Sequence, residues 1–237
     1  MALPQVNTPT YELEVPSTGE KIKYRPFLVK EEKILMIAME AEEQSGIIRA
    51  VKEIVQACTF DSLDVSKMPM FDVEYVFLNI RAKSVGEESK IRLKCPDDEK
   101  TFVDTTIDLT KVNVEMSDGH SNKIELTDEM GMVMKYPTID SFGDFDAGEV
   151  SADNMIDMIS GCIQQIYDKK GEEVFEAKDS TKKELVDFIE QLNSKQFQDV
   201  QKFFDTMPKL THTVKIKNPK TKKESEIVLS GLNDFFG

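Results

Sequence analysis

The chain has 237 residues, of which 40% are hydrophobic and 31% charged, as in a globular protein rather than a disordered one. Its net charge of −14 argues against nucleic acid and anionic membrane surfaces as main partners. The longest apolar run, Ile34–Met39, is too short to cross a bilayer, and the first residues lack the basic and apolar regions of a secretory signal.

The first predicted elements are a β-hairpin and three helices. Apolar residues alternate with Glu and Lys on both sides of a Pro/Gly turn within Tyr11–Phe27, as two antiparallel strands require. The segment Val29–Gln44 is rich in strong helix formers, Gly46 interrupts it, and Ile47–Cys58 carries an apolar stripe at helical spacing. Pro69–Gly86 repeats that spacing and predicts the third helix.

A β-ribbon follows, because apolar residues alternate with period two over Lys90–Leu109. Its tip, Leu93–Phe102, reads LKCPDDEKTF and has two interpretations: one knuckle of a zinc ribbon, or a hairpin turn that carries a thiol. Glycines and a proline break up residues 113–150, where KIEL and MVMKY indicate two short strands and DSFGDFDAGE an exposed loop.

The second half repeats the order of helices and ribbon. Met155–Ile166 carries an apolar helix face, and two more helices are expected over Leu185–Leu192 and Phe197–Met207, with Ser194 as a cap between them. Period two returns after His212 and predicts a long hairpin with a lysine-rich turn.

The fold class is therefore α+β, with two helical clusters each followed by an antiparallel β-ribbon, plus an N-terminal β-hairpin. We expect three consecutive regions: 1–112 with the hairpin, first helices and first ribbon; 113–150 as a connecting region; and 151–237 with the second cluster and ribbon. A weak internal repeat would place Pro96 and Pro219 at equivalent ribbon tips.

The sequence predicts no metal or cofactor site. Zinc needs four ligands at fixed spacing, but Cys95 has no partner cysteine nearby in a suitable element. Cys58 and Cys162 continue apolar helix faces and are expected in the core, although a catalytic thiol paired with His120 stays an alternative. Counted as a calcium loop from Asp144, the segment misses the required residues at its fifth, sixth and twelfth positions, which are Gly148, Glu149 and Met155.

Charge and apolarity mark two candidate contact regions. Residues 136–168 hold seven acids and no Lys or Arg, whereas Lys209–Glu224 holds six lysines and one acid, which indicates solvated surfaces or docking faces. The C-terminal apolar residues must dock in the chain's own core or in a partner. The residues predicted as possible partner contacts are Leu232, Phe235, Phe236, Lys220, Lys222 and Lys223.

Three strings, YRPFLVKEEKILMIAME, MPMFDVEYVFLNIRAKSVGE and LSGLNDFF, resemble the baseplate hub subunit or hub assembly protein of T-even-like contractile-tailed bacteriophages. The resemblance implies tail assembly in the cytoplasm of an infected bacterium, with other hub or tail proteins as partners and no catalytic activity. It leaves open whether the chain stays in the virion baseplate or acts as a transient assembly chaperone. An alternative from another class is a small enzyme with an unrecognised site. We expect no cofactor, no nucleic acid and no membrane, and leave the oligomeric state open.

Overall fold

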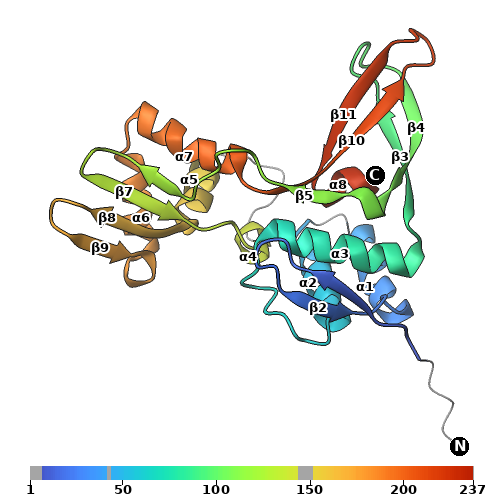
Figure 1. Ribbon diagram of the computed structural model, residues 1–237, viewed down its shortest axis with the longest axis horizontal. Helices are drawn as coiled ribbons and strands as arrows, with labels where there is room; N and C mark the ends of the chain where they lie inside the picture. Colours follow the sequence, from blue (N-terminus) through green and yellow to red (C-terminus); the bar gives the residue numbers. More distant parts are fainter. Residues whose placement is uncertain (1–6, 42–43, 144–151, 237) are drawn as a thin grey trace, which may run out of the picture. The chain divides into compact units, whose positions relative to one another are not determined.

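The computed structural model describes residues 7–41, 44–143 and 152–236 and confirms the α+β class. The chain folds into two compact units, shown in Figure 1. Unit 1 combines Met1–Glu115 with Lys209–Gly237, and unit 2 is Met116–Pro208. The units differ from the three consecutive regions expected, because the C-terminal ribbon belongs with the N-terminal half of the chain.

Unit 1 begins with the predicted hairpin, β1 (Tyr11–Glu14) and β2 (Lys21–Tyr24). Its turn is tied to the first turn of the third helix, since Ser17 donates its backbone N–H and its hydroxyl to the buried carboxylate of Asp72. Burial raises the pKa of Asp72, while the bonds from Ser17 oppose that shift. The hairpin is thus fixed to the helices by a buried carboxylate whose hydrogen bonds come from the hairpin turn.

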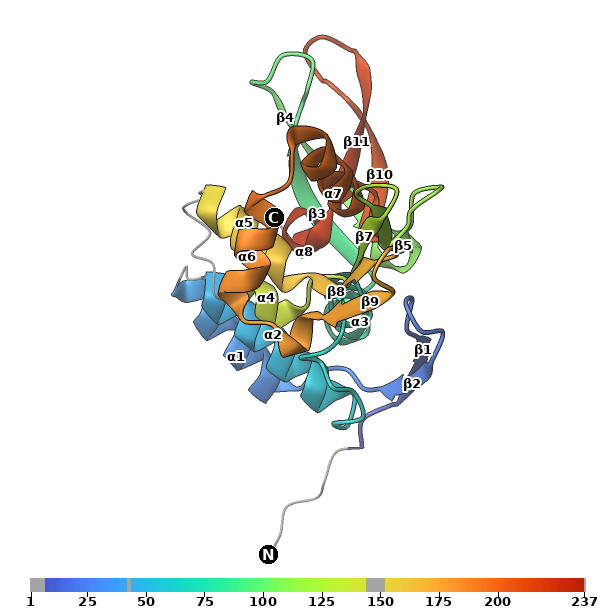
Figure 2. The ribbon, with the colours of Figure 1, turned by 90° about the vertical axis from the view of Figure 1, so that its left-hand side faces the viewer.

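Three helices form the body of unit 1: α1 (Val29–Glu40), α2 (Gln44–Cys58) and α3 (Met70–Val85). Figure 2 shows α1 and α2 side by side. The helix α2 starts before Gly46, so this glycine lies in a first turn, where its cost to helix stability is tolerated. Half of the residues of α3 are buried, because its apolar residues are spread around the helix rather than along one face.

Two antiparallel ribbons complete unit 1 and extend together in both views (Figures 1 and 2). The first pairs β3 (Glu88–Lys94) with β4 (Phe102–Asp108). In the second, β10 (Lys209–Lys217) lies between β11 (Glu224–Ser230) and the short strand β5 (Asn113–Glu115). The pairing of β10 with β5 joins parts of the chain that are far apart in sequence.

The two ribbon tips have equivalent turns. At the first tip, Cys95 donates its N–H to the Thr101 carbonyl and accepts a bond from the Glu99 N–H. At the second, Asn218 bonds in the same way to Lys223 and Lys222.

Glu99 lies four positions after Cys95, and Lys222 lies four positions after Asn218. Both have a left-handed backbone conformation, with φ of 51° at Glu99 and 64° at Lys222. Pro96 and Pro219 therefore occupy equivalent positions, as predicted. The likeness between the halves is confined to the ribbons, because a β-hairpin interrupts the second helical cluster.

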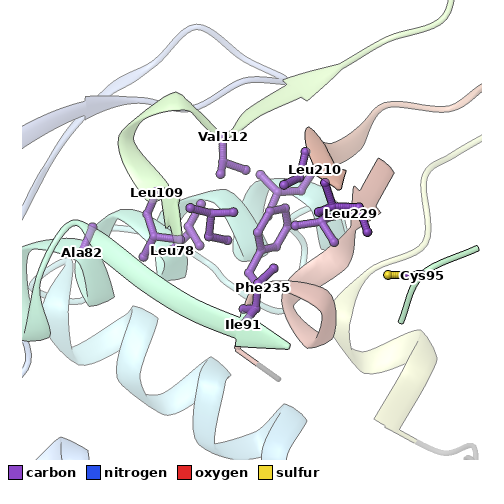
Figure 3. Packing of buried hydrophobic residues seen from close by; sticks show 12 residues of the cluster. Leu78, Ala82, Ile91, Cys95, Leu109, Val112, Leu210, Leu229 and Phe235 are labelled. Atoms are coloured by element: carbon purple, nitrogen blue, oxygen red, sulfur yellow. The ribbon is translucent and has the colours of Figure 1, made fainter. Parts of the chain in front are cut away.

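The short helix α8 (Gly231–Phe236) returns the chain to the core of unit 1. Phe235 is fully buried, and its carbonyl accepts a hydrogen bond of 2.8 Å from Ser89 Oγ on β3. Figure 3 shows its ring among Ile91, Leu210 and Leu229, so α3, both ribbons and α8 share one apolar cluster.

Unit 2 is a four-stranded antiparallel sheet with helices. The strand order is β6 (Lys123–Glu125), β7 (Met130–Met134), β8 (Ile163–Asp168) and β9 (Glu173–Glu176), which confirms both short strands predicted in the connecting region. The helices are α4 (Ile139–Gly143), α5 (Ala152–Gly161), α6 (Lys182–Glu190) and α7 (Ser194–Thr206). The segment DSFGDFDAGE was expected as a loop, but α4 occupies its start. The rest of that segment lies in residues 144–151, outside the described residues.

One helix prediction in unit 2 is wrong. Met155–Ile166 was expected as a single helix, but α5 ends at Gly161 and the next residues form β8. The β-branched Ile163 and Ile166 pair with β7, and this pairing outweighs the helical spacing. The cap before α7 is also one residue earlier than predicted: Asn193, not Ser194, accepts the bonds from the first helical N–H groups.

Replacing Phe235 by alanine tests the shared core of unit 1. We expect the variant to lose about 4 kcal/mol of unfolding free energy, because a fully buried aromatic ring leaves a cavity. Denaturant unfolding measures the loss, with Leu232→Ala as the control, since Leu232 is only half-buried against the same cluster. Equal and small losses in both variants would contradict the packing.

Candidate functional site

The helix α1 is anchored to unit 1 through its first turn. Glu31 is 3% exposed, pairs with the Arg25 guanidinium at 2.9 Å and accepts a 2.7 Å bond from the Leu28 N–H. Arg25 also reaches the Pro26 carbonyl at 3.0 Å and Cys58 Sγ at 3.6 Å, at the end of α2. Burial alone would raise the pKa of Glu31, but the bonds from Arg25 and Leu28 outweigh it and hold that pKa below its ordinary value.

The rest of α1 exposes an unusual amount of apolar surface. Glu31 is its one buried side chain among the helix residues described. Val29 is 78% exposed and Met36 is 57% exposed. We call the exposed apolar set the α1 surface; it consists of Leu28, Val29, Ile34, Met36, Ile37 and Met39.

The sequence explains why this surface forms. Apolar residues lie all round α1, so one packed face against α2 cannot cover them. An exposed apolar patch of this kind marks a protein contact in soluble proteins. Methionine adapts its shape to a partner, which suits Met36 and Met39 to such a contact. Sequence analysis missed the α1 surface, although the lack of a polar face over Val29–Glu40 was the available signal.

The predicted lysine contacts lie at the tip of the second ribbon, beside the acidic tip of the first. Asn218 Nδ2 donates to Asp97 Oδ1 at 2.9 Å, and Thr221 Oγ1 donates to the other carboxylate oxygen. These bonds from Asn218 and Thr221 lower the pKa of Asp97. The tip that carries Lys220, Lys222 and Lys223 is therefore held in place from within unit 1.

The predicted C-terminal contacts differ in burial where the structure describes them. Phe235 lies in the core of its own unit, which is the first of the two docking places expected for it. Leu232 packs half-buried against that core. The side chain of Phe236 lies outside the described residues. Of these three residues, Leu232 alone keeps described surface for a partner.

The cysteines are buried side chains, with thiol pKa values that burial raises. All three are buried, and burial raises the pKa to about 11 for Cys58 and to about 12 for Cys162. His120 is engaged elsewhere, with Nδ1 at 2.9 Å from Thr206 Oγ1 and Nε2 at 3.1 Å from Tyr136 Oη. The predicted burial of Cys58 and Cys162 is confirmed, although Cys162 lies between α5 and β8 rather than on a helix face.

The tip thiol belongs to the core as well. Cys95 is fully buried in the apolar cluster of unit 1, and burial raises its pKa, with Asp97 and Asp98 adding to the effect. Over the residues that the structure describes, no three His, Cys, Asp or Glu side chains gather as a metal site would require. The loop of Asp144, Asp146 and Glu149, weighed as a calcium site, lies outside them. None of the described helices is long and apolar enough to span a membrane.

The exposed apolar side chains of α1 and the two ribbons of unit 1 offer surfaces for contacts with other proteins. A family model described as T4 bacteriophage base plate protein matches residues 8–237. The chain belongs to this baseplate family, which makes it a phage tail component that contacts other baseplate proteins. No curated protein and no solved structure matches the chain.

Replacing Glu31 by glutamine tests the anchor of α1. We expect a loss of roughly 3 kcal/mol in unfolding free energy, because the buried Arg25 keeps its charge without a partner. The folded pKa of Glu31 lies below the ordinary 4.5, so its contribution is present above pH 4.5 and lost as the pH falls through the folded pKa.

The wild-type chain should therefore lose this part of its stability in acid, while the variant has none to lose. Unfolding curves at a series of pH values measure both effects. Glu32→Gln, in the same turn but exposed, is the matched control and should change little. A variant with the wild-type pH profile would refute the anchor.

Proposed function

We propose that the chain is a non-enzymatic component of the baseplate hub that joins other hub proteins through its α1 surface. Assembly takes place in the cytoplasm of the infected bacterium, and the chain stays in the virion baseplate. The family supports the structural role, and the hub assignment rests on the sequence resemblance.

The observation that carries this proposal is the exposure of α1. Several large apolar side chains on one short helix lose contact with water when a partner covers them, and each contributes about 1 to 2 kcal/mol when fully buried. The anchor at Glu31 keeps the helix in place before the partner arrives, which lowers the ordering cost of binding. The α1 surface thus has both the apolar area and the rigidity of a docking site.

A second contact of the proposed function is the lysine-bearing ribbon tip. Lys220, Lys222 and Lys223 stand out in a chain of net charge −14 and suit an acidic patch on another hub protein. The bonds from Asn218 and Thr221 to Asp97 hold this tip in one arrangement. Charges at such a rim contribute to partner choice and association rate more than to affinity.

Two alternatives remain as outcomes of the test. A transient chaperone would use the same α1 surface but would leave before the baseplate is complete. An enzyme would need a reactive group, and the raised pKa values of Cys58 and Cys162 keep both thiols protonated at neutral pH. The structural role is the proposal that accounts for the exposed helix.

The test compares baseplates assembled with the wild-type chain and with Met36→Gln/Ile37→Gln. Glutamine keeps helix propensity while removing apolar surface, so we expect normal folding but roughly tenfold less of the variant in purified baseplates. Quantitative mass spectrometry measures the amount, and circular dichroism checks the fold.

Met116→Gln and Val228→Gln are the controls, since these side chains are 63% and 61% exposed outside α1 and should leave incorporation unchanged. Normal incorporation of the α1 variant would contradict the proposed docking site. Wild-type chain that is needed for assembly yet absent from finished baseplates would establish the transient chaperone instead.

A further inference from the structure

Two charged residues of α1, Lys33 and Glu40, take part in none of the ion pairs found among the described residues. Lys33 and Glu40 are exposed and lie seven residues apart, nearly two helical turns, so they point to the same side of α1. Met36 and Ile37 lie between them on that side. A lysine ahead of a glutamate is the order that the helix dipole disfavours, so this arrangement does not stabilise the isolated helix.

The positions of Lys33 and Glu40 on one copy of α1 are complementary to those on a second copy that runs in the opposite direction. In two antiparallel copies of α1, Lys33 of each copy faces Glu40 of the other, and the two-fold axis passes between Met36 and Ile37. Met36 and Ile37, which are 57% and 56% exposed, then meet at the centre, with an ion pair on each side. A parallel arrangement would place lysine against lysine and glutamate against glutamate.

We propose that the α1 surface binds a second copy of this chain, with the two α1 helices antiparallel and the chain acting as a homodimer. This rests on the proposed function, because it takes the docking surface assigned there and names a second copy of the chain as the hub protein that covers it. The helix is about 18 Å long, so the contact is at the small end of specific interfaces. We therefore expect a dissociation constant on the order of micromolar.

The chemistry of the surface favours a second copy over an unrelated acidic or basic partner. The side of α1 that exposes Met36 and Ile37 has Lys33 before them and Glu40 after them, so a partner of uniform charge would attract one of these two residues and repel the other. The reversed copy matches both ends and the centre. Self-association through one patch also closes after two chains, as a two-fold interface requires.

Sedimentation equilibrium of the full chain, from below to well above micromolar concentration, measures the proposed dimer. We expect the wild-type chain to dimerise and Met36→Gln/Ile37→Gln to remain monomeric. Lys33→Glu and Glu40→Lys should each weaken dimerisation roughly tenfold, because each replaces two attractive pairs with repulsive ones. The double variant Lys33→Glu/Glu40→Lys restores complementary charges and should dimerise like the wild type.

An equal mixture of Lys33→Glu and Glu40→Lys should form mixed dimers more readily than either variant alone. Lys183→Glu, an exposed reversal on α6, is the control and should leave dimerisation unchanged. A chain that is monomeric throughout, a dimer indifferent to α1 substitutions, or a double variant as weak as the single ones would overturn the proposal.

The result separates this inference from the proposed function. A monomeric chain that still enters baseplates only with an intact α1 surface overturns the homodimer and leaves the docking function. A dimer that depends on α1 but enters baseplates regardless of α1 substitutions supports the homodimer and contradicts the docking function.

Discussion

Unit 1 depends on one cluster of apolar side chains that joins two distant stretches of the chain. Leu78 and Ile91 come from the N-terminal stretch, and Leu210, Leu229 and Phe235 from the C-terminal one. Neither stretch covers its own apolar side chains without the other. The pairing of β5 with β10, the meeting of the ribbon tips and the anchoring of α8 all follow from this shared core.

The α1 surface is a consequence of how α1 is attached to the rest of unit 1. The buried pair of Arg25 and Glu31 fixes the start of the helix and ties it to the end of α2, so α1 keeps one orientation. Burying a charge is favourable only with a close partner, which is why the anchor is polar while the surface beyond it is apolar. The helix is held firmly at one end and left open along its length.

Local pattern predicted most elements, and long-range packing decided the rest. The alternation around Tyr11–Tyr24 and the stripe before Cys58 gave the hairpin and α2, because neighbouring residues determine both. Ile163 and Ile166 fit a helix equally well by spacing, and only pairing with β7 made them a strand. The burial of Phe235 was one of two expected outcomes, and the core cluster decided between them. The α1 surface depends on which elements fail to cover the helix, and its local signal was the lack of a polar face over Val29–Glu40.

The division of unit 1 between the two ends of the chain has a consequence for biosynthesis. A ribosome makes the N-terminal stretch first, then all of unit 2, and only then the ribbon that completes the first core. Unit 2 is continuous in sequence, so it can fold while unit 1 still waits for β10 and β11. Until then Leu78, Ile91 and Ile107 remain open to water on the nascent chain. The N-terminal stretch is therefore the part of the nascent chain that needs shielding from aggregation while unit 2 is being made.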